Sequence, residues 1–198
     1  EGSPLFGCVT ATTDTSGNTI LYGYDSLGRR IYESNSEYEG LYYNYDALGR
    51  VTSVTPIVHA TSTGTFHPQS NAENVQYTYD PQTNRLSQIN TATTTYSFEY
   101  DEFGNTSKIY VGNQILAQYR YYNNNGKLWM MRYGTGKIIE YKYDELDRIQ
   151  EVCYTDNSGT TQSYKYIYTA TGAVHSIEST ESGRLYLYKY DSKGQTVG

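Results

Sequence analysis

Residues 22–29 read YGYDSLGR and residues 43–50 read YNYDALGR, and this short unit decides the fold. Six later stretches repeat it with variations: YTYDPQTNR, FEYDEFGN, YRYYNNNGK, YKYDELDR, YIYTATGA and YKYDSKGQ. The second aromatic residue of the eight units falls at Tyr24, Tyr45, Tyr79, Tyr100, Tyr121, Tyr143, Tyr168 and Tyr190. Five of the seven steps between these tyrosines are 21 or 22 residues long. Such a regular period indicates a repeat array.

Each repeat predicts a β-hairpin. The Tyr-x-Tyr pattern puts both rings on one face of a strand. The next residue, Asp, favours the first position of a type I turn, and the Gly after it favours the positive φ of a hairpin loop with a bulge. Asn and Asp tolerate the same conformation. These turn residues are Asp25 and Gly28, Asp46 and Gly49, Asp80 and Asn84, Asp101 and Gly104, Gly126, Asp144 and Asp147, Gly172, and Asp191 and Gly194.

The turn geometry also predicts which residues face one another across each hairpin. The predicted ion pairs are Asp25–Arg29, Asp46–Arg50, Asp80–Arg85 and Asp144–Arg148. Tyr122 would face Lys127, where a cation–π contact could replace the ion pair. On the other face, aromatic–aliphatic pairs should form at Tyr45–Val51, Tyr79–Leu86, Tyr121–Leu128, Tyr143–Ile149 and Tyr168–Val174. These pairs indicate a shared buried surface, with the phenolic hydroxyls at a half-wet rim.

The predicted fold class is all-β, an antiparallel meander of repeated hairpins with essentially no helix. Residues 1–18 would form an N-terminal flank, either a loop or a partial strand. Residues 19–198 would hold the eight repeats, with a loop insertion at about residues 56–74 that is rich in Thr, Ser and Pro. Turn residues at 111–113, 134–136, 156–159 and 181–183 would close the opposite ends of the hairpins.

Composition narrows the range of partners. The chain has 198 residues, 25 of them tyrosine, and a formal net charge of −6. An acidic chain without a Lys/Arg cluster argues against nucleic acid as a main partner. No apolar run is long enough to cross a bilayer as a helix, so this segment should not insert into a membrane. Cys8 and Cys153 are expected to be unpaired thiols, although one bridge between them stays open.

The repeated unit resembles the YD repeat of the Rhs family, which teneurins and the B and C components of Tc toxin complexes share. The resemblance covers about residues 19–198 and implies a β-sheet that spirals into a hollow shell. In bacterial toxins such a shell encloses a toxic polypeptide, and in teneurins it is part of a surface receptor. A secreted or cell-surface location follows from the resemblance alone.

This sequence departs from the full family pattern. It ends at Gly198, before a return strand after residues 191–194 is complete, and it lacks the family's closing signature. We therefore expect a fragment of a larger wall or a short stand-alone member. Its edge strands should be covered by flanking segments of a larger polypeptide or by a second copy. An enclosed toxin or a surface glycan is the further partner to consider.

Chemical motifs are scarce. His59 and His67 share the inserted loop without a Cys or carboxylate at metal spacing, and His175 lies in a predicted strand. We therefore predict no catalytic, metal or cofactor site, and a non-enzymatic structural scaffold. The alternative is an extracellular carbohydrate- or receptor-binding module, with Tyr122 and Trp129 as the candidate ligand surface. A hydrolase is a third possibility that rests only on the abundance of carboxylates.

Overall fold

The structure is a computed structural model that describes residues 7–37, 39–57 and 74–197. Within these residues it contains sixteen β-strands and no helix, which confirms the all-β prediction. The strands are β1 (Ala11–Thr13), β2 (Thr19–Tyr24), β3 (Arg30–Asn35), β4 (Gly40–Tyr45), β5 (Val51–Ile57), β6 (Val75–Tyr79), β7 (Leu86–Asn90), β8 (Thr95–Tyr100), β9 (Thr106–Val111), β10 (Gln114–Tyr121), β11 (Leu128–Tyr133), β12 (Ile138–Tyr143), β13 (Ile149–Thr155), β14 (Thr161–Tyr168), β15 (Val174–Ser179) and β16 (Leu185–Leu187).

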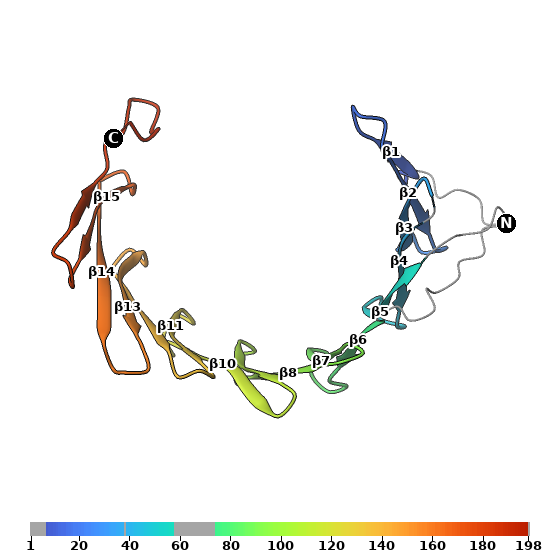
Figure 1. Ribbon diagram of the computed structural model, residues 1–198, viewed down its shortest axis with the longest axis horizontal. Helices are drawn as coiled ribbons and strands as arrows, with labels where there is room; N and C mark the ends of the chain where they lie inside the picture. Colours follow the sequence, from blue (N-terminus) through green and yellow to red (C-terminus); the bar gives the residue numbers. More distant parts are fainter. Residues whose placement is uncertain (1–6, 38, 58–73, 198) are drawn as a thin grey trace. The chain divides into compact units, whose positions relative to one another are not determined.

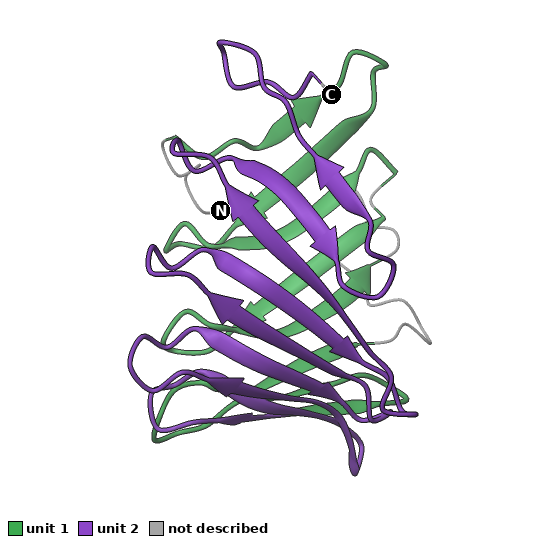
Figure 2. Ribbon diagram, turned by 90° about the vertical axis from the view of Figure 1, so that its left-hand side faces the viewer, with its two compact units in different colours: residues 1–97 green, residues 98–198 purple. Residues whose placement is uncertain are grey.

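The strands are hydrogen-bonded in the order in which they occur along the chain, from β1 to β16, without a crossover. Figure 1 follows this meander from strand to strand. The chain divides into two compact units at the boundary between Ser97 and Phe98, coloured separately in Figure 2. Repeats one to three lie in the first unit, and repeats four to eight lie in the second, apart from the start of β8.

The hairpin tips have the predicted geometry. At the second repeat, the Asp46 N–H donates to the Arg50 carbonyl (2.9 Å) and the Gly49 N–H donates to the Asp46 carbonyl (3.0 Å). Gly49 has φ of 79°, and the non-glycine residues Asn84 and Asp147 have φ of 59° and 65° at the equivalent position. The glycines at 28, 104 and 194 close their tips with the same pair of hydrogen bonds.

The predicted cross-strand register is also confirmed. The aromatic–aliphatic pairs form at all five predicted positions: Tyr45↔Val51, Tyr79↔Leu86, Tyr121↔Leu128, Tyr143↔Ile149 and Tyr168↔Val174. One residue beyond each pair, the register shifts and the return strand carries an extra residue. After the five pairs, this residue is Thr52, Ser87, Trp129, Gln150 or His175. Ile31 is the corresponding extra residue after the Tyr24↔Arg30 pair of the first repeat. Such a β-bulge bends the strand and re-aims a side chain.

The core is thinner than the aromatic pairs predict. Within each unit, the contacts between described strands join strands that are neighbours in the sheet. Among the described residues, only Ile57, Ala117 and Val152 are buried apolar side chains, at 3–5% exposure. The paired rings are half-buried instead of sharing an enclosed core.

Other predictions have mixed outcomes. The opposite ends of the hairpins turn where predicted, between β9 and β10, β11 and β12, β13 and β14, and β15 and β16. Cys8 and Cys153 are both free thiols. Most of the predicted insertion, with His59 and His67, lies outside the described residues. The part of the chain that the structure describes contains no helix long and apolar enough to span a membrane.

Candidate functional site

At several hairpin tips, a basic residue links its own repeat to the next one. At the sixth repeat, Arg148 donates from Nε to Asp144 Oδ2 (2.7 Å), and its guanidinium lies 4.3 Å from the centroid of the Tyr168 ring. The Tyr168 hydroxyl donates back to the carbonyl of Ile149, the residue after Arg148 (2.6 Å). We call this arrangement the repeat staple. It consists of the Asp and Arg of one hairpin tip, the tyrosine of the next repeat, and the backbone carbonyl to which the hydroxyl of that tyrosine donates.

The repeat staple recurs within both units. The cation lies over the next ring at Arg29–Tyr45 (4.8 Å), Arg50–Tyr79 (4.3 Å) and Lys127–Tyr143 (4.8 Å). The hydroxyl bonds to the preceding repeat are Tyr45–Arg30, Tyr79–Val51, Tyr121–Thr106, Tyr143–Leu128 and Tyr190–Val174, and Tyr24 bonds Val9. These hydroxyls therefore have backbone partners, and their tyrosines are half-buried.

The predicted ion pairs form at Asp25–Arg29, Asp46–Arg50 and Asp144–Arg148. At the third repeat, Asp80 and Arg85 face each other through the backbone hydrogen bond that closes the loop. The predicted cation–π contact between Tyr122 and Lys127 is wrong. Lys127 Nζ lies over the ring of Tyr143 and pairs with Asp147 Oδ1 (3.2 Å), because the basic side chain reaches toward the next repeat.

The tip aspartates are bound into the turns. Asp46 Oδ1 accepts the backbone N–H groups of Leu48 and Arg50 (both 2.9 Å), and Oδ2 accepts Nε of Arg50 (2.7 Å). The backbone hydrogen bond from Arg50 is the main cause that lowers the pKa of Asp46, and the Arg148 side chain likewise lowers the pKa of Asp144. A general acid at neutral pH needs a raised pKa. Asp46 and Asp144 therefore lack the raised pKa that acid catalysis by a hydrolase requires.

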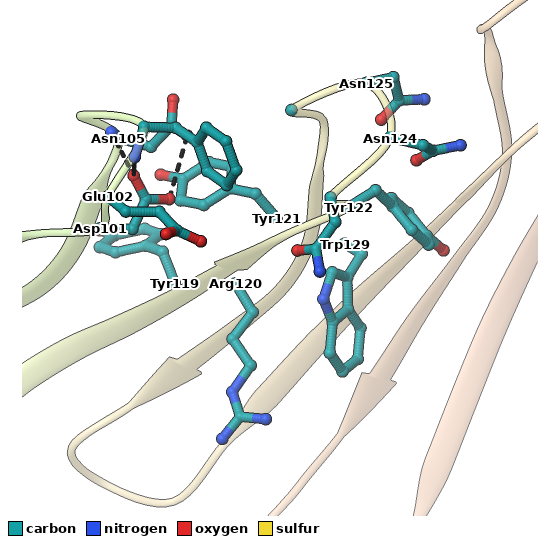
Figure 3. Close-up of a pocket in the computed structure, with 13 residues that line it drawn as sticks. Asp101, Glu102, Asn105, Tyr119, Arg120, Tyr121, Tyr122, Asn124, Asn125 and Trp129 are labelled. Carbon is teal, nitrogen blue, oxygen red and sulfur yellow. Dashed lines mark hydrogen bonds between the residues drawn. The ribbon is translucent and has the colours of Figure 1, made fainter.

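One hollow in the second unit stands apart from the staples. It has a volume of about 660 Å³ and lies between the turn after β8 and the four-residue loop after β10. Figure 3 shows Trp129 and Tyr122 on one side and Asp101, Glu102 and Tyr119 on the other. The structure thus brings together the two candidate ligand residues that the sequence indicates.

The two aromatic rings of this hollow form an angled wall. The centroids of Tyr122 and Trp129 lie 6.3 Å apart, with an angle of 46° between the planes. The Tyr122 hydroxyl donates to the Tyr141 carbonyl (3.2 Å), and the ring meets Tyr143 edge-on at 6.2 Å. Tyr122 is therefore held in place by β12 and does not swing freely.

Some polar groups of the hollow are hydrogen-bonded within their own turn, and others are exposed. Asp101 accepts from the side chain and the backbone N–H of Asn105 (3.0 and 2.8 Å), so it belongs to its turn. Glu102, Asn123 and Asn124 are exposed on the rim. Sequence reasoning missed Glu102, since its position opposite the loop depends on the pairing of neighbouring repeats. Elsewhere, no group of three or more His, Cys, Asp or Glu among the described side chains could hold a metal ion.

Comparison with known proteins finds similar chains in two settings. No protein-family model matches the chain. Teneurin-3 of Mus musculus is 29% identical over 113 residues, and teneurin-3 of Danio rerio is 28% identical over 113 residues. Each match covers 53% of this chain and only 4% of the teneurin.

Solved structures of TcdB2–TccC3 share the fold. One has a TM-score of 0.68 at 16% identity, and one that lacks the hypervariable C-terminal region has a TM-score of 0.66 at 17% identity. Each covers 94% of this chain, which in turn covers 12% of the solved one. Together, the sequence and structural similarities support a relationship to the Rhs/YD-repeat proteins.

Proposed function

We propose that this chain, a relative of the Rhs/YD-repeat proteins, is a non-enzymatic segment in the wall of a larger β-shell. Such a shell would encapsulate a toxin or form part of a cell-surface protein, and the chain would be secreted or surface-located. The repeat staple carries this proposal. It engages the Asp, Arg and Tyr of the repeated unit in contacts with their own or the next repeat. Side chains committed in this way extend and stiffen a sheet.

The ends of the strand order support a wall segment. β16 (Leu185–Leu187) pairs only with β15 among the described strands, and all three of its residues are exposed. Leu185 and Leu187 are each 57% exposed. An apolar edge strand is a template for pairing with another strand. Flanking segments of a longer polypeptide, or a second copy, would supply that strand.

The relatives support the same proposal through their size. This chain covers a small part of each one, 4% of the teneurins and 12% of the TcdB2–TccC3 chains. TcdB2–TccC3 consists of Tc toxin components. The structural match to it covers 94% of the present chain. A short stretch of a long repetitive wall would produce this relationship.

The test uses the complete polypeptide that contains this segment. Limited proteolysis of the native polypeptide should leave a protected partner segment if the wall encloses cargo. The double variant Arg50→Ala/Arg148→Ala should expose that segment to the protease, because it opens two staples. Flanks that are cleaved at once, together with surface labelling of intact cells, would favour the cell-surface form of the wall. Substrate turnover lost in a folded Asp144→Asn variant would contradict the non-enzymatic role.

A further inference from the structure

The repetition of the chain provides an internal comparison, and the fifth repeat departs from it at three places. The tip Asp is replaced by Tyr122, three asparagines occupy residues 123–125 of the loop, and the bulge residue is Trp129. The length of the loop is not a departure, because the third repeat has the same extra residue. At the bulge position the other repeats carry Ile31, Thr52, Ser87, Gln150 and His175. Trp129 is the single tryptophan of the chain.

The staple does not explain these departures. The fifth repeat keeps two contacts of the staple, since Lys127 lies 4.8 Å from the Tyr143 ring centroid and the Tyr143 hydroxyl donates to the Leu128 carbonyl (2.8 Å). Yet Tyr122, the asparagine loop and Trp129 all line the same hollow of about 660 Å³. This volume falls within the usual range for small-molecule sites. Three neighbouring changes that converge on one hollow indicate a binding role for it.

The lining identifies the class of ligand. A wall of two aromatic rings offers apolar faces, whereas the amides of Asn123 and Asn124 both donate and accept hydrogen bonds. Glu102, across the hollow, adds an acceptor. A purely apolar ligand would leave these polar groups without partners, and a polyanion would meet the carboxylates of a chain with net charge −6. A pyranose ring suits both the aromatic wall and the polar groups, because its C–H face is apolar and its edge carries hydroxyl groups.

We infer that the hollow between the turn after β8 and the loop after β10 binds a short neutral oligosaccharide. Trp129 and Tyr122 stack on a sugar ring, and Asn124 and Glu102 bind its hydroxyls. Tyr122 is already held by the Tyr141 carbonyl, so little side-chain freedom is lost on binding. This site does not depend on the scaffold role, because it rests on the residues that depart from the repeat.

The test exploits the single tryptophan. The whole 198-residue chain is titrated with maltohexaose, cellohexaose and chitohexaose, and the fluorescence of Trp129 is followed. At least one saccharide should give a saturable change. By calorimetry, Trp129→Ala should weaken that binding about tenfold or more, as expected for the loss of an aromatic contact. Asn124→Ala should weaken it severalfold, whereas Gln150→Ala, at the same bulge position one repeat later, should not change it.

Several outcomes would overturn the inference. One is a folded chain whose Trp129 fluorescence responds to none of the three saccharides up to millimolar concentrations. Another is binding that persists undiminished in both Trp129→Ala and Asn124→Ala. A third is binding of a proline-rich peptide, the other ligand that suits aromatic grooves, without binding of saccharides. If circular dichroism shows that Trp129→Ala does not fold, Asn124→Ala, which changes an exposed side chain, decides the question.

Discussion

Replacing Arg148 by Met tests the repeat staple at the junction between the sixth and seventh repeats. The change removes the ion pair with Asp144 and the cation above the Tyr168 ring. The first contributes about 0.2–1 kcal/mol, and the second about 0.5–1 kcal/mol. We therefore expect the free energy of unfolding to fall by about 1–2 kcal/mol. Tyr168→Leu removes the same cation–π contact from the other side, together with the hydroxyl bond to Ile149, worth about 0.5–1.5 kcal/mol.

A double-mutant cycle isolates the contact that the two residues share. Arg148→Met and Tyr168→Leu should be non-additive by about 0.5–1 kcal/mol, the value of the cation–π contact. Arg148→Met and Tyr168→Phe should be additive, because phenylalanine keeps the ring. Urea unfolding measures each variant by far-ultraviolet circular dichroism and by the fluorescence of Trp129. The two transitions must coincide for the free energies to be compared.

The next junction supplies a matched control. There the basic residue is replaced by Ala173, yet the Tyr190 hydroxyl still bonds the Val174 carbonyl (2.7 Å). Tyr190→Phe should cost about the same as Tyr168→Phe, since both variants lose only a hydroxyl bond. A coupling between Arg148 and Tyr168 below about 0.3 kcal/mol would refute the staple as a stabilising contact, because that is the error of additivity.

Four further predictions follow from the same geometry. The double variant Thr169→Asp/Ala173→Arg should install the missing staple and raise the free energy of unfolding by about 0.5–1.5 kcal/mol, as measured by urea unfolding; no gain would show that this junction cannot hold an ion pair. Gly49→Ala should cost about 1–2 kcal/mol in the same assay because of its positive φ, and an unchanged midpoint would contradict the turn geometry. Asp46 and Asp144 have lowered pKa values when folded, so their contribution to stability is present above the unfolded pKa of about 3.9 and is lost as pH falls through the lower folded values. Melting temperatures that stay level from about pH 5 to about pH 2 would exclude this linkage. Leu187→Lys should reduce self-association at the β16 edge, which sedimentation velocity measures, and equal association of both proteins would place the contact elsewhere.

The sequence predicts one wall of the candidate site but not the wall opposite it. Tyr122 and Trp129 stand out because they break the repeat, and the structure places them on one wall. The opposite side of the hollow comes from the preceding repeat, where Glu102 looks like any exposed turn residue. Its role as a lining residue depends on how neighbouring hairpins align, which no local pattern encodes.

The amino-acid sequence by itself determined the hairpins, their tips and their register. Each tip is closed by residues four or five positions apart, such as Asp46 and Arg50, so the conformational preferences of Asp and Gly are sufficient. Only the tertiary structure decided where the arginines and tyrosines point. Their contacts join residues 15 to 29 positions apart in neighbouring repeats, for example Tyr45 with Arg30 and Tyr79 with Arg50. The small number of buried apolar side chains among the described residues is likewise a property of the assembled sheet, because burial depends on what covers a face and not on the residues that form it.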